Sequence, residues 1–123
     1  MSDRPAALRA FLRGFAYAFR GIAFGLHTQR NLRVHAFVSI IVVVLGLVLG
    51  IERWEWCAVM LSCGIVWAAE LLNTALEQLA DRVSKEREDA IRDVKDAAAG
   101  AVLAASLAAA AVGLIIFLPR LLT

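Results

Sequence analysis

Long apolar runs, separated by short charged segments, dominate the pattern of hydrophobic and polar positions along the chain. Residues 34–51 and 97–118 carry no formal charge, and residues 56–79 continue in helix-forming residues past Glu70. A helix needs about 20 residues to cross a bilayer core that is about 30 Å thick. The pattern therefore predicts three transmembrane helices, and the third is expected to end before Pro119 because proline cannot continue a helix.

The segment before the first run has a different periodicity. Apolar side chains recur there at helical spacing, at Phe11, Phe15, Ala18 and Ile22. Arginines occupy other angles of the same helix. This arrangement predicts a basic amphipathic helix over about residues 5–25 that lies on the inner leaflet as an anchor, with a direct role in substrate binding as the alternative.

Basic residues predict the orientation of these helices. Six arginines precede the first span and five basic residues lie between the second and the third, whereas the opposite ends hold only Arg53 and Arg120. Because basic residues in short loops stay on the cytoplasmic side, we expect a cytoplasmic N-terminus and an external C-terminus.

Composition supports a membrane protein and narrows its chemistry. Of the 123 residues, 61% are hydrophobic and 20% charged, whereas soluble domains are about half apolar. The length allows a single domain over residues 1–123, so any chemistry belongs to the membrane helices or their ends. A net charge of +2 is too small to indicate a nucleic-acid partner. Cys57 and Cys63 are expected to be buried structural thiols.

Small residues predict close helix packing. They recur at every fourth position of the third span, at Ala97, Ala101, Ala105, Ala109 and Gly113. Gly46 and Gly50 form a similar pair in the first span, and such residues let another backbone approach closely in lipid. Because three thin helices do not enclose a polar site alone, we expect a homo-oligomer with sites between protomers.

The second span carries a polar stripe. Helical spacing places its members on one face: Glu70, Asn73, Thr74, Glu77 and Asp81. A carboxylate at membrane depth is costly and marks a functional site by default. Glu70 is therefore a candidate general base, and Asn73 is placed to hold it or a substrate hydroxyl. Glu77 and Asp81 have a plainer alternative interpretation, the solvated end of the helix.

The charged segment over residues 81–96 is predicted to be mainly a solvated helix surface with pairs of opposite charge. Lys95 and Asp96 differ because they come directly before the third span, where they could meet the inner end of the polar stripe. A lysine beside several acids is what an ATP phosphate with its magnesium requires. The sequence contains no P-loop motif, so a nucleotide would have to bind in another arrangement.

These motifs carry a family resemblance. Glu-Leu-Leu-Asn-Thr-Ala-Leu-Glu at residues 70–77, with Asp81 and then Lys-Asp-Ala-Ala-Ala-Gly-Ala-Val at 95–102, resembles the signature of the small prokaryotic diacylglycerol kinase family. This family includes the undecaprenol kinases. The resemblance extends from about Tyr17 to the C-terminus, and Thr-Gln-Arg-Asn-Leu-Arg-Val-His at 28–35 is similar to the undecaprenol kinase branch.

The resemblance implies an all-α membrane protein in the bacterial inner membrane. Each chain would have an N-terminal amphipathic surface helix and three transmembrane helices, and three chains would form a homotrimer. The implied reaction is transfer of the γ-phosphate of MgATP to a membrane lipid alcohol at the cytoplasmic interface. Undecaprenol is the favoured substrate and diacylglycerol the next.

The resemblance also implies roles for single residues. Glu70 resembles the catalytic base, with Asn73 beside it, and Glu77 resembles a magnesium ligand that also contacts ATP. The other implied nucleotide contacts are Tyr17, Glu86, Lys95 and Asp96. Either Arg9 or Arg13 matches a further arginine that contacts the nucleotide.

Gln29 departs from the family pattern, which has a glutamate there that shares the metal with the residue matching Glu77. An amide oxygen can still bind magnesium but brings no charge, so the affinity for the metal should fall. Gln29 thus keeps open an alternative to the kinase, a catalytically weakened or non-catalytic membrane homologue. A channel or transporter subunit would explain Glu70 but not the Lys95-Asp96 pair.

Overall fold

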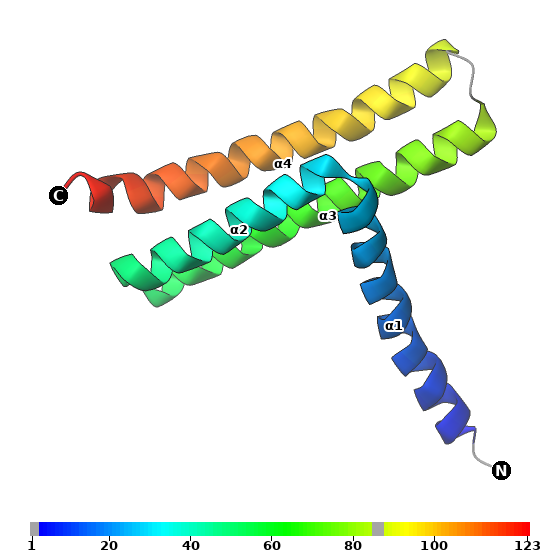
Figure 1. Ribbon diagram of the computed structural model, residues 1–123, viewed down its shortest axis with the longest axis horizontal. Helices are drawn as coiled ribbons and strands as arrows, with labels where there is room; N and C mark the ends of the chain where they lie inside the picture. Colours follow the sequence, from blue (N-terminus) through cyan, green and yellow to red (C-terminus); the bar gives the residue numbers. More distant parts are fainter. Residues whose placement is uncertain (1–2, 85–87) are drawn as a thin grey trace.

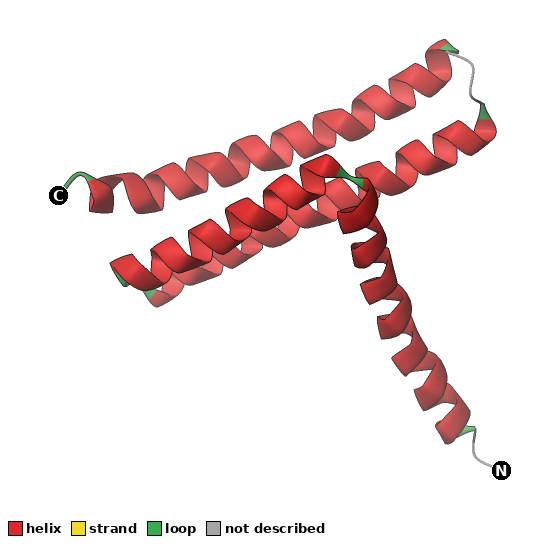
Figure 2. Ribbon diagram, viewed as in Figure 1, coloured by secondary structure: helices red, strands yellow, loops and turns green. Residues whose placement is uncertain are grey.

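The computed structural model describes residues 3–84 and 88–123, and the described residues fold into four α-helices with short connections (Figure 2). The helices are α1 (Arg4–Thr28), α2 (Arg30–Leu49), α3 (Arg53–Val83) and α4 (Asp89–Leu121). By length and composition, α2, α3 and α4 are each able to cross a membrane. The all-helical class and the three apolar spans are therefore confirmed.

Helix α3 is the centre of the molecule. Helix α4 packs along α3, α2 packs on α3 beside it, and α1 leaves this bundle at a steep angle (Figure 1). The C-terminus lies at the same end as the α2–α3 connection (Figure 1). Most large apolar side chains of the spans stay exposed in one chain, as expected for helices that face lipid or further copies.

The turn between α2 and α3 is set by local backbone chemistry. Gly50 ends α2 in the left-handed region at φ 63°, which glycine adopts without steric cost. Helix α3 then begins with a capping box, in which the Glu52 backbone N–H donates to a carboxylate oxygen of Glu55 at 2.9 Å. The two glycines therefore have separate structural roles. Gly50 forms the turn, and Gly46 packs against Trp56 of the same chain.

The corner between α1 and α2 is a single extended residue, Gln29, at φ −114° and ψ 115°. The guanidinium group of Arg33 donates to the backbone oxygens of Leu26 at 2.9 Å and His27 at 3.1 Å, which have no partner further along α1. Leu32 is fully buried beside this corner. These contacts fix the direction in which α1 leaves the bundle.

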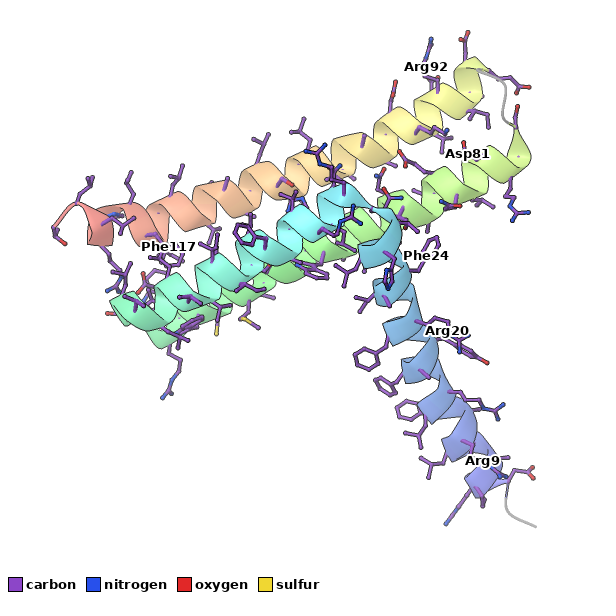
Figure 3. All side chains as sticks on the ribbon, in the orientation of Figure 1. Arg9, Arg20, Phe24, Asp81, Arg92 and Phe117 are labelled. Atoms are coloured by element: carbon purple, nitrogen blue, oxygen red, sulfur yellow. The ribbon has the colours of Figure 1, made fainter. Side chains whose placement is uncertain are left out.

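Helix α1 is exposed along most of its length. Phe11 and Phe15 are more than half exposed, and their rings meet edge to face at a centroid distance of 5.2 Å. Figure 3 shows a row of aromatic rings on one side of α1, with Arg20 on the other side.

Helix α4 corrects one expectation and agrees with another. It continues through Pro119 to Leu121, so the predicted end before Pro119 is wrong. The proline removes one donor in the last turn, and the helix goes on because the Leu122 N–H still donates to the Leu118 oxygen at 3.1 Å. Helix α4 also begins at Asp89, well before the apolar run, so the charged residues from 89 to 96 are helical.

Ion pairs join α3 and α4 near both ends. At the end near the C-terminus, Arg120 bonds to Glu55, whose side chain is 7% exposed. A small apolar core lies at this end, made of Ile51, Val59, Ile116 and Phe117. At the other end, the Lys95 ammonium lies 2.6 Å from an Asp81 oxygen. Figure 3 shows Phe117 and Asp81 near these opposite ends of the helix pair.

The small residues of α4 and the two cysteines differ in burial. Ala105, Ala109 and Gly113 are half-buried, whereas Ala97 and Ala101 are exposed on one chain. Cys63 is half-buried, but Cys57 is exposed, so its expected burial is wrong. Cys57 lies on the side of α3 that faces away from its neighbours, which the apolar character of the run does not reveal.

Candidate functional site

The polar stripe of α3 changes from buried to exposed along the helix. Glu70 and Thr74 are buried at 3% and 4% exposure, Asn73 and Glu77 are half-buried, and Asp81 is exposed. Glu70 is buried where α3 faces α2, and Thr74 lines a pocket beside α1. Glu70 is therefore a carboxylate held inside the apolar part of the bundle.

The Glu70 carboxylate has a charged or polar partner on α2. The Nε2 atom of His35 lies 3.1 Å from Glu70 Oε1, and the His35 side chain is 25% exposed. One helical turn further along α2, Ser39 Oγ accepts a hydrogen bond from Trp67 Nε1 at 3.0 Å and donates to the His35 backbone oxygen at 2.7 Å. Two polar contacts one turn apart thus hold α2 and α3 in register.

Thr74 and Asn73, the neighbours of Glu70 on α3, differ in their hydrogen bonding. The Thr74 hydroxyl donates to the Glu70 backbone oxygen at 2.9 Å, so its hydrogen bond is made to the helix backbone and not to the Glu70 carboxylate. The side-chain oxygen of Asn73 is buried and has no hydrogen-bond partner in the part of the chain that the structure describes. A buried acceptor of this kind is satisfied by a bound group that donates a hydrogen bond.

Glu70 and Asn73 face an open pocket of about 310 Å³ between α2, α3 and α4. Its remaining lining residues come from α2 and α4: Asn31, Val34, His35, Ala99, Val102, Leu103 and Ser106. An apolar groove of about 280 Å³ continues from it between the same helices and shares Val34, His35 and Ser106. The carboxylate is therefore reached from a pocket that is polar at one end and apolar beyond it.

Lys95 meets the polar stripe through Asp81, at the exposed end of α3. Its Nζ atom is 2.6 Å from Asp81 Oδ1, and both side chains are partly exposed, at 37% and 54%. Asp96 is exposed one residue further on. A cation and several carboxylates therefore share one end of the α3–α4 pair.

The other predicted site residues lie apart from this pocket. Tyr17 is exposed on α1, with the Arg20 guanidinium carbon 5.4 Å from its ring centroid. Gln29 is half-buried at the α1–α2 corner. Glu86 lies outside the described residues. Among the described residues, one chain therefore gathers Glu70 and Asn73 in a pocket and places Lys95 near the same stripe, whereas Tyr17 and Gln29 lie elsewhere.

A magnesium site was expected at Gln29 and Glu77. In residues 3–84 and 88–123, no three His, Cys, Asp or Glu side chains come close enough to hold a metal ion. Magnesium, however, is usually held by one or two carboxylates together with substrate phosphates and water. Glu77 offers a carboxylate and Gln29 an amide oxygen, which are donor types that magnesium accepts.

A sequence model described as prokaryotic diacylglycerol kinase matches residues 16–117, which is most of the chain. The chain belongs to this family. Undecaprenol kinase from Bacillus subtilis (strain 168) is 35% identical over 119 residues, which cover 97% of both chains. Diacylglycerol kinase from Synechocystis is 39% identical over 110 residues, which cover 89% of this chain and 63% of that relative. Diacylglycerol kinase from Pseudomonas aeruginosa is 31% identical over 85 residues, 69% of this chain and 63% of that relative.

Membership in the prokaryotic diacylglycerol kinase family confirms the expected enzyme class, a lipid kinase. Together with the three apolar helices, it also confirms a multi-pass membrane protein. The family match spans α2, α3 and α4 almost completely, so the pocket around Glu70 lies within the part that the family shares.

Sequence reasoning gave no role to His35, although a signal was present. Asn31, His35 and Ser39 recur every fourth residue of α2 and form a second, shorter polar stripe. In the structure, His35 meets Glu70, Ser39 meets Trp67 and Asn31 lines the pocket. Two polar stripes on neighbouring apolar helices have a common explanation, because each supplies partners that lipid cannot supply.

Proposed function

We propose that the protein is an ATP- and magnesium-dependent kinase of a membrane lipid alcohol, with Glu70 as the general base. The observation that carries this proposal is the buried Glu70 carboxylate, which lines an open pocket beside an apolar groove. A lipid that entered sideways from the membrane would bring its hydroxyl to the polar end of this pocket. Diffusion through water is not needed for such a substrate.

In the proposed reaction, Glu70 takes the hydroxyl proton of the lipid while the hydroxyl oxygen forms a bond to the γ-phosphorus of ATP. The bond between the γ-phosphorus and the bridging oxygen breaks, and ADP leaves. Phosphoryl transfer depends mainly on positioning and on stabilising charge, which small proteins can provide. The unpaired oxygen of Asn73 supports this scheme as an acceptor beside the same pocket.

Lys95 is proposed to supply positive charge to the ATP phosphates. Its ammonium group pairs with Asp81, which keeps it near the polar stripe. Glu77 and Gln29 would hold magnesium, which neutralises phosphate charge when bound. Tyr17, Glu86 and Asp96, with Arg9 or Arg13, complete the proposed nucleotide contacts on the strength of the family motif.

We also propose a homotrimer in the bacterial inner membrane, with the sites between protomers and one domain per chain. Two observations support an assembly: the pocket at Glu70 is open on a single chain, and the small residues Ala97 and Ala101 are exposed. The distribution of basic residues supports a cytoplasmic N-terminus, with α1 as an amphipathic helix on the inner leaflet.

Undecaprenol is the favoured substrate and diacylglycerol the next. The match to undecaprenol kinase covers 97% of both chains, whereas the match to the Synechocystis diacylglycerol kinase covers 63% of that relative. The test is to offer both lipids to purified protein with labelled ATP and magnesium. Label in undecaprenyl phosphate in excess of phosphatidic acid is expected, and label in neither lipid would overturn the kinase proposal.

A second candidate, a weakened or non-catalytic homologue, rests on Gln29. This residue lacks the charge that the family motif places at the metal. The same assay separates the candidates, because a non-catalytic protein would label no lipid at any magnesium concentration.

A further inference from the structure

We propose that His35 is a positioning residue for the catalytic base. Its imidazole Nε2–H donates to Glu70 Oε1 and leaves Oε2 to take the proton of the lipid hydroxyl. This inference rests on the proposed role of Glu70 and adds a residue from α2 that the family motif did not supply. The contact that carries it is the 3.1 Å distance between His35 Nε2 and Glu70 Oε1.

A carboxylate in this position needs a donor. Glu70 is 3% exposed, and an ionised carboxylate away from water is stable only when hydrogen-bonded or paired. The Thr74 hydroxyl is committed to the backbone, and the α4 residues that line the pocket contribute Ser106 and otherwise apolar side chains. In the described parts of the chain, His35 Nε2 is the side-chain nitrogen that lies within ion-pair distance of the carboxylate, 3.1 Å from Oε1.

His35 is itself fixed by its surroundings. Its backbone oxygen accepts from Ser39 Oγ, which also accepts from Trp67 on α3. Leu32, one turn earlier on α2, is fully buried against the α1 corner. The imidazole therefore lies between two fixed points of α2, which is what a residue that orients another side chain requires.

His35 also lies where the polar pocket joins the apolar groove, because it lines both. One edge of the ring faces the carboxylate while the ring body contributes to the apolar wall. An imidazole with a proton on Nε2 suits this position, since that N–H can be directed at Glu70 while the ring carbons lie against apolar side chains.

The contact can be tested without measuring activity. The chain has two histidines, so His27→Gln leaves His35 as the single imidazole for nitrogen NMR. The full-length protein in lipid nanodiscs should show a protonated Nε2 whose shift moves when Glu70→Gln is added. A freely exchanging Nε2 that does not respond to Glu70→Gln would overturn the proposal, whether or not the protein is a kinase.

Kinetics test the consequence for the reaction. His35→Leu removes the donor and should lower kcat about 10-fold to 100-fold, with KM for ATP and for the lipid unchanged within about threefold. His35→Gln places an amide N–H at the same number of bonds from the backbone and should restore kcat to within about fivefold of the wild type.

Each outcome of these assays decides one question. Wild-type kcat in His35→Leu, or equal loss in His35→Leu and His35→Gln, would overturn the positioning role while the kinase proposal stands. Absence of lipid phosphorylation by the wild type would overturn the kinase proposal, and the nitrogen NMR result would then decide the contact. His27→Leu, an exposed histidine on α1, is the matched control and should keep wild-type kcat.

Discussion

Gly25 lies where α1 crosses α2 and α3, and it offers a sharp test of that corner. A methyl group added there would lie 2.7 Å from Leu32 Cδ2 and 2.9 Å from Leu71 Cδ2. Carbon atoms pack best at about 3.5–4.0 Å, so both contacts are too close by roughly 0.6–0.8 Å. Leu32 is fully buried and has little room to move, so Gly25→Ala should cost about 1–3 kcal/mol through overpacking.

The matched control is Gly21→Ala, one turn earlier on α1, where an added methyl group meets no atom within 4 Å. Both variants gain helix propensity, worth about 1 kcal/mol, so their difference isolates the overpacking. Reversible unfolding in mixed detergent micelles should show Gly25→Ala less stable than Gly21→Ala by about 1–3 kcal/mol. Equal stability of the two variants would refute the close packing of this corner.

Three further substitutions test the proposed metal ligand, the proposed phosphate contact and the ion pair between α3 and α4. Gln29→Glu restores a carboxylate and should lower the magnesium concentration for half-maximal activity about tenfold; an unchanged magnesium dependence would remove residue 29 from the metal site. Lys95→Ala should raise KM for ATP about 10-fold to 100-fold and leave KM for the lipid unchanged, and the reverse pattern would contradict its role at the phosphates. Arg120→Met leaves the buried Glu55 carboxylate unpaired and should lower the melting temperature, whereas the double variant with Glu55→Gln should recover part of the loss. An unchanged melting temperature of Arg120→Met would show that this pair does not stabilise the C-terminal end of the α3–α4 pair.

The sequence predicted the features that depend on local pattern. Apolar runs located α2, α3 and α4, and helical periodicity placed Glu70 and Thr74 on one face, where both are buried. These features follow from composition and from the fixed angle per residue of a helix, which require no knowledge of neighbouring helices.

Features that depend on the register between helices were missed. The contact of His35 with Glu70 joins residues 35 positions apart, and the Ser39–Trp67 hydrogen bond joins the same two helices one turn away. Pro119 was expected to end α4, but a proline in the last turn removes only one donor, and the helix continues to Leu121. Local sequence patterns indicate which helices can form and where they tend to end. Contacts between helices determine which side chains meet.

The nucleotide contacts followed from the family motif rather than from geometry. Lys95 lies near the stripe through Asp81, but Tyr17 and Gln29 lie on α1 and at its corner, away from the pocket of Glu70. Residues that act together on a nucleotide need not touch in one chain when a site is completed by a second copy. This is the physical reason why the assembly and the site are proposed together.

Glu70→Gln tests the central claim most directly, because it keeps the shape of the side chain and removes its ability to take a proton. Glu52→Gln, the same change at the exposed residue that precedes α3, is the control. With labelled ATP, magnesium and undecaprenol, the account predicts that Glu70→Gln lowers kcat by about 10²-fold to 10⁴-fold while ATP binding is kept. Lipid phosphorylation by Glu70→Gln at the rate of Glu52→Gln would contradict the assignment of Glu70 as the base.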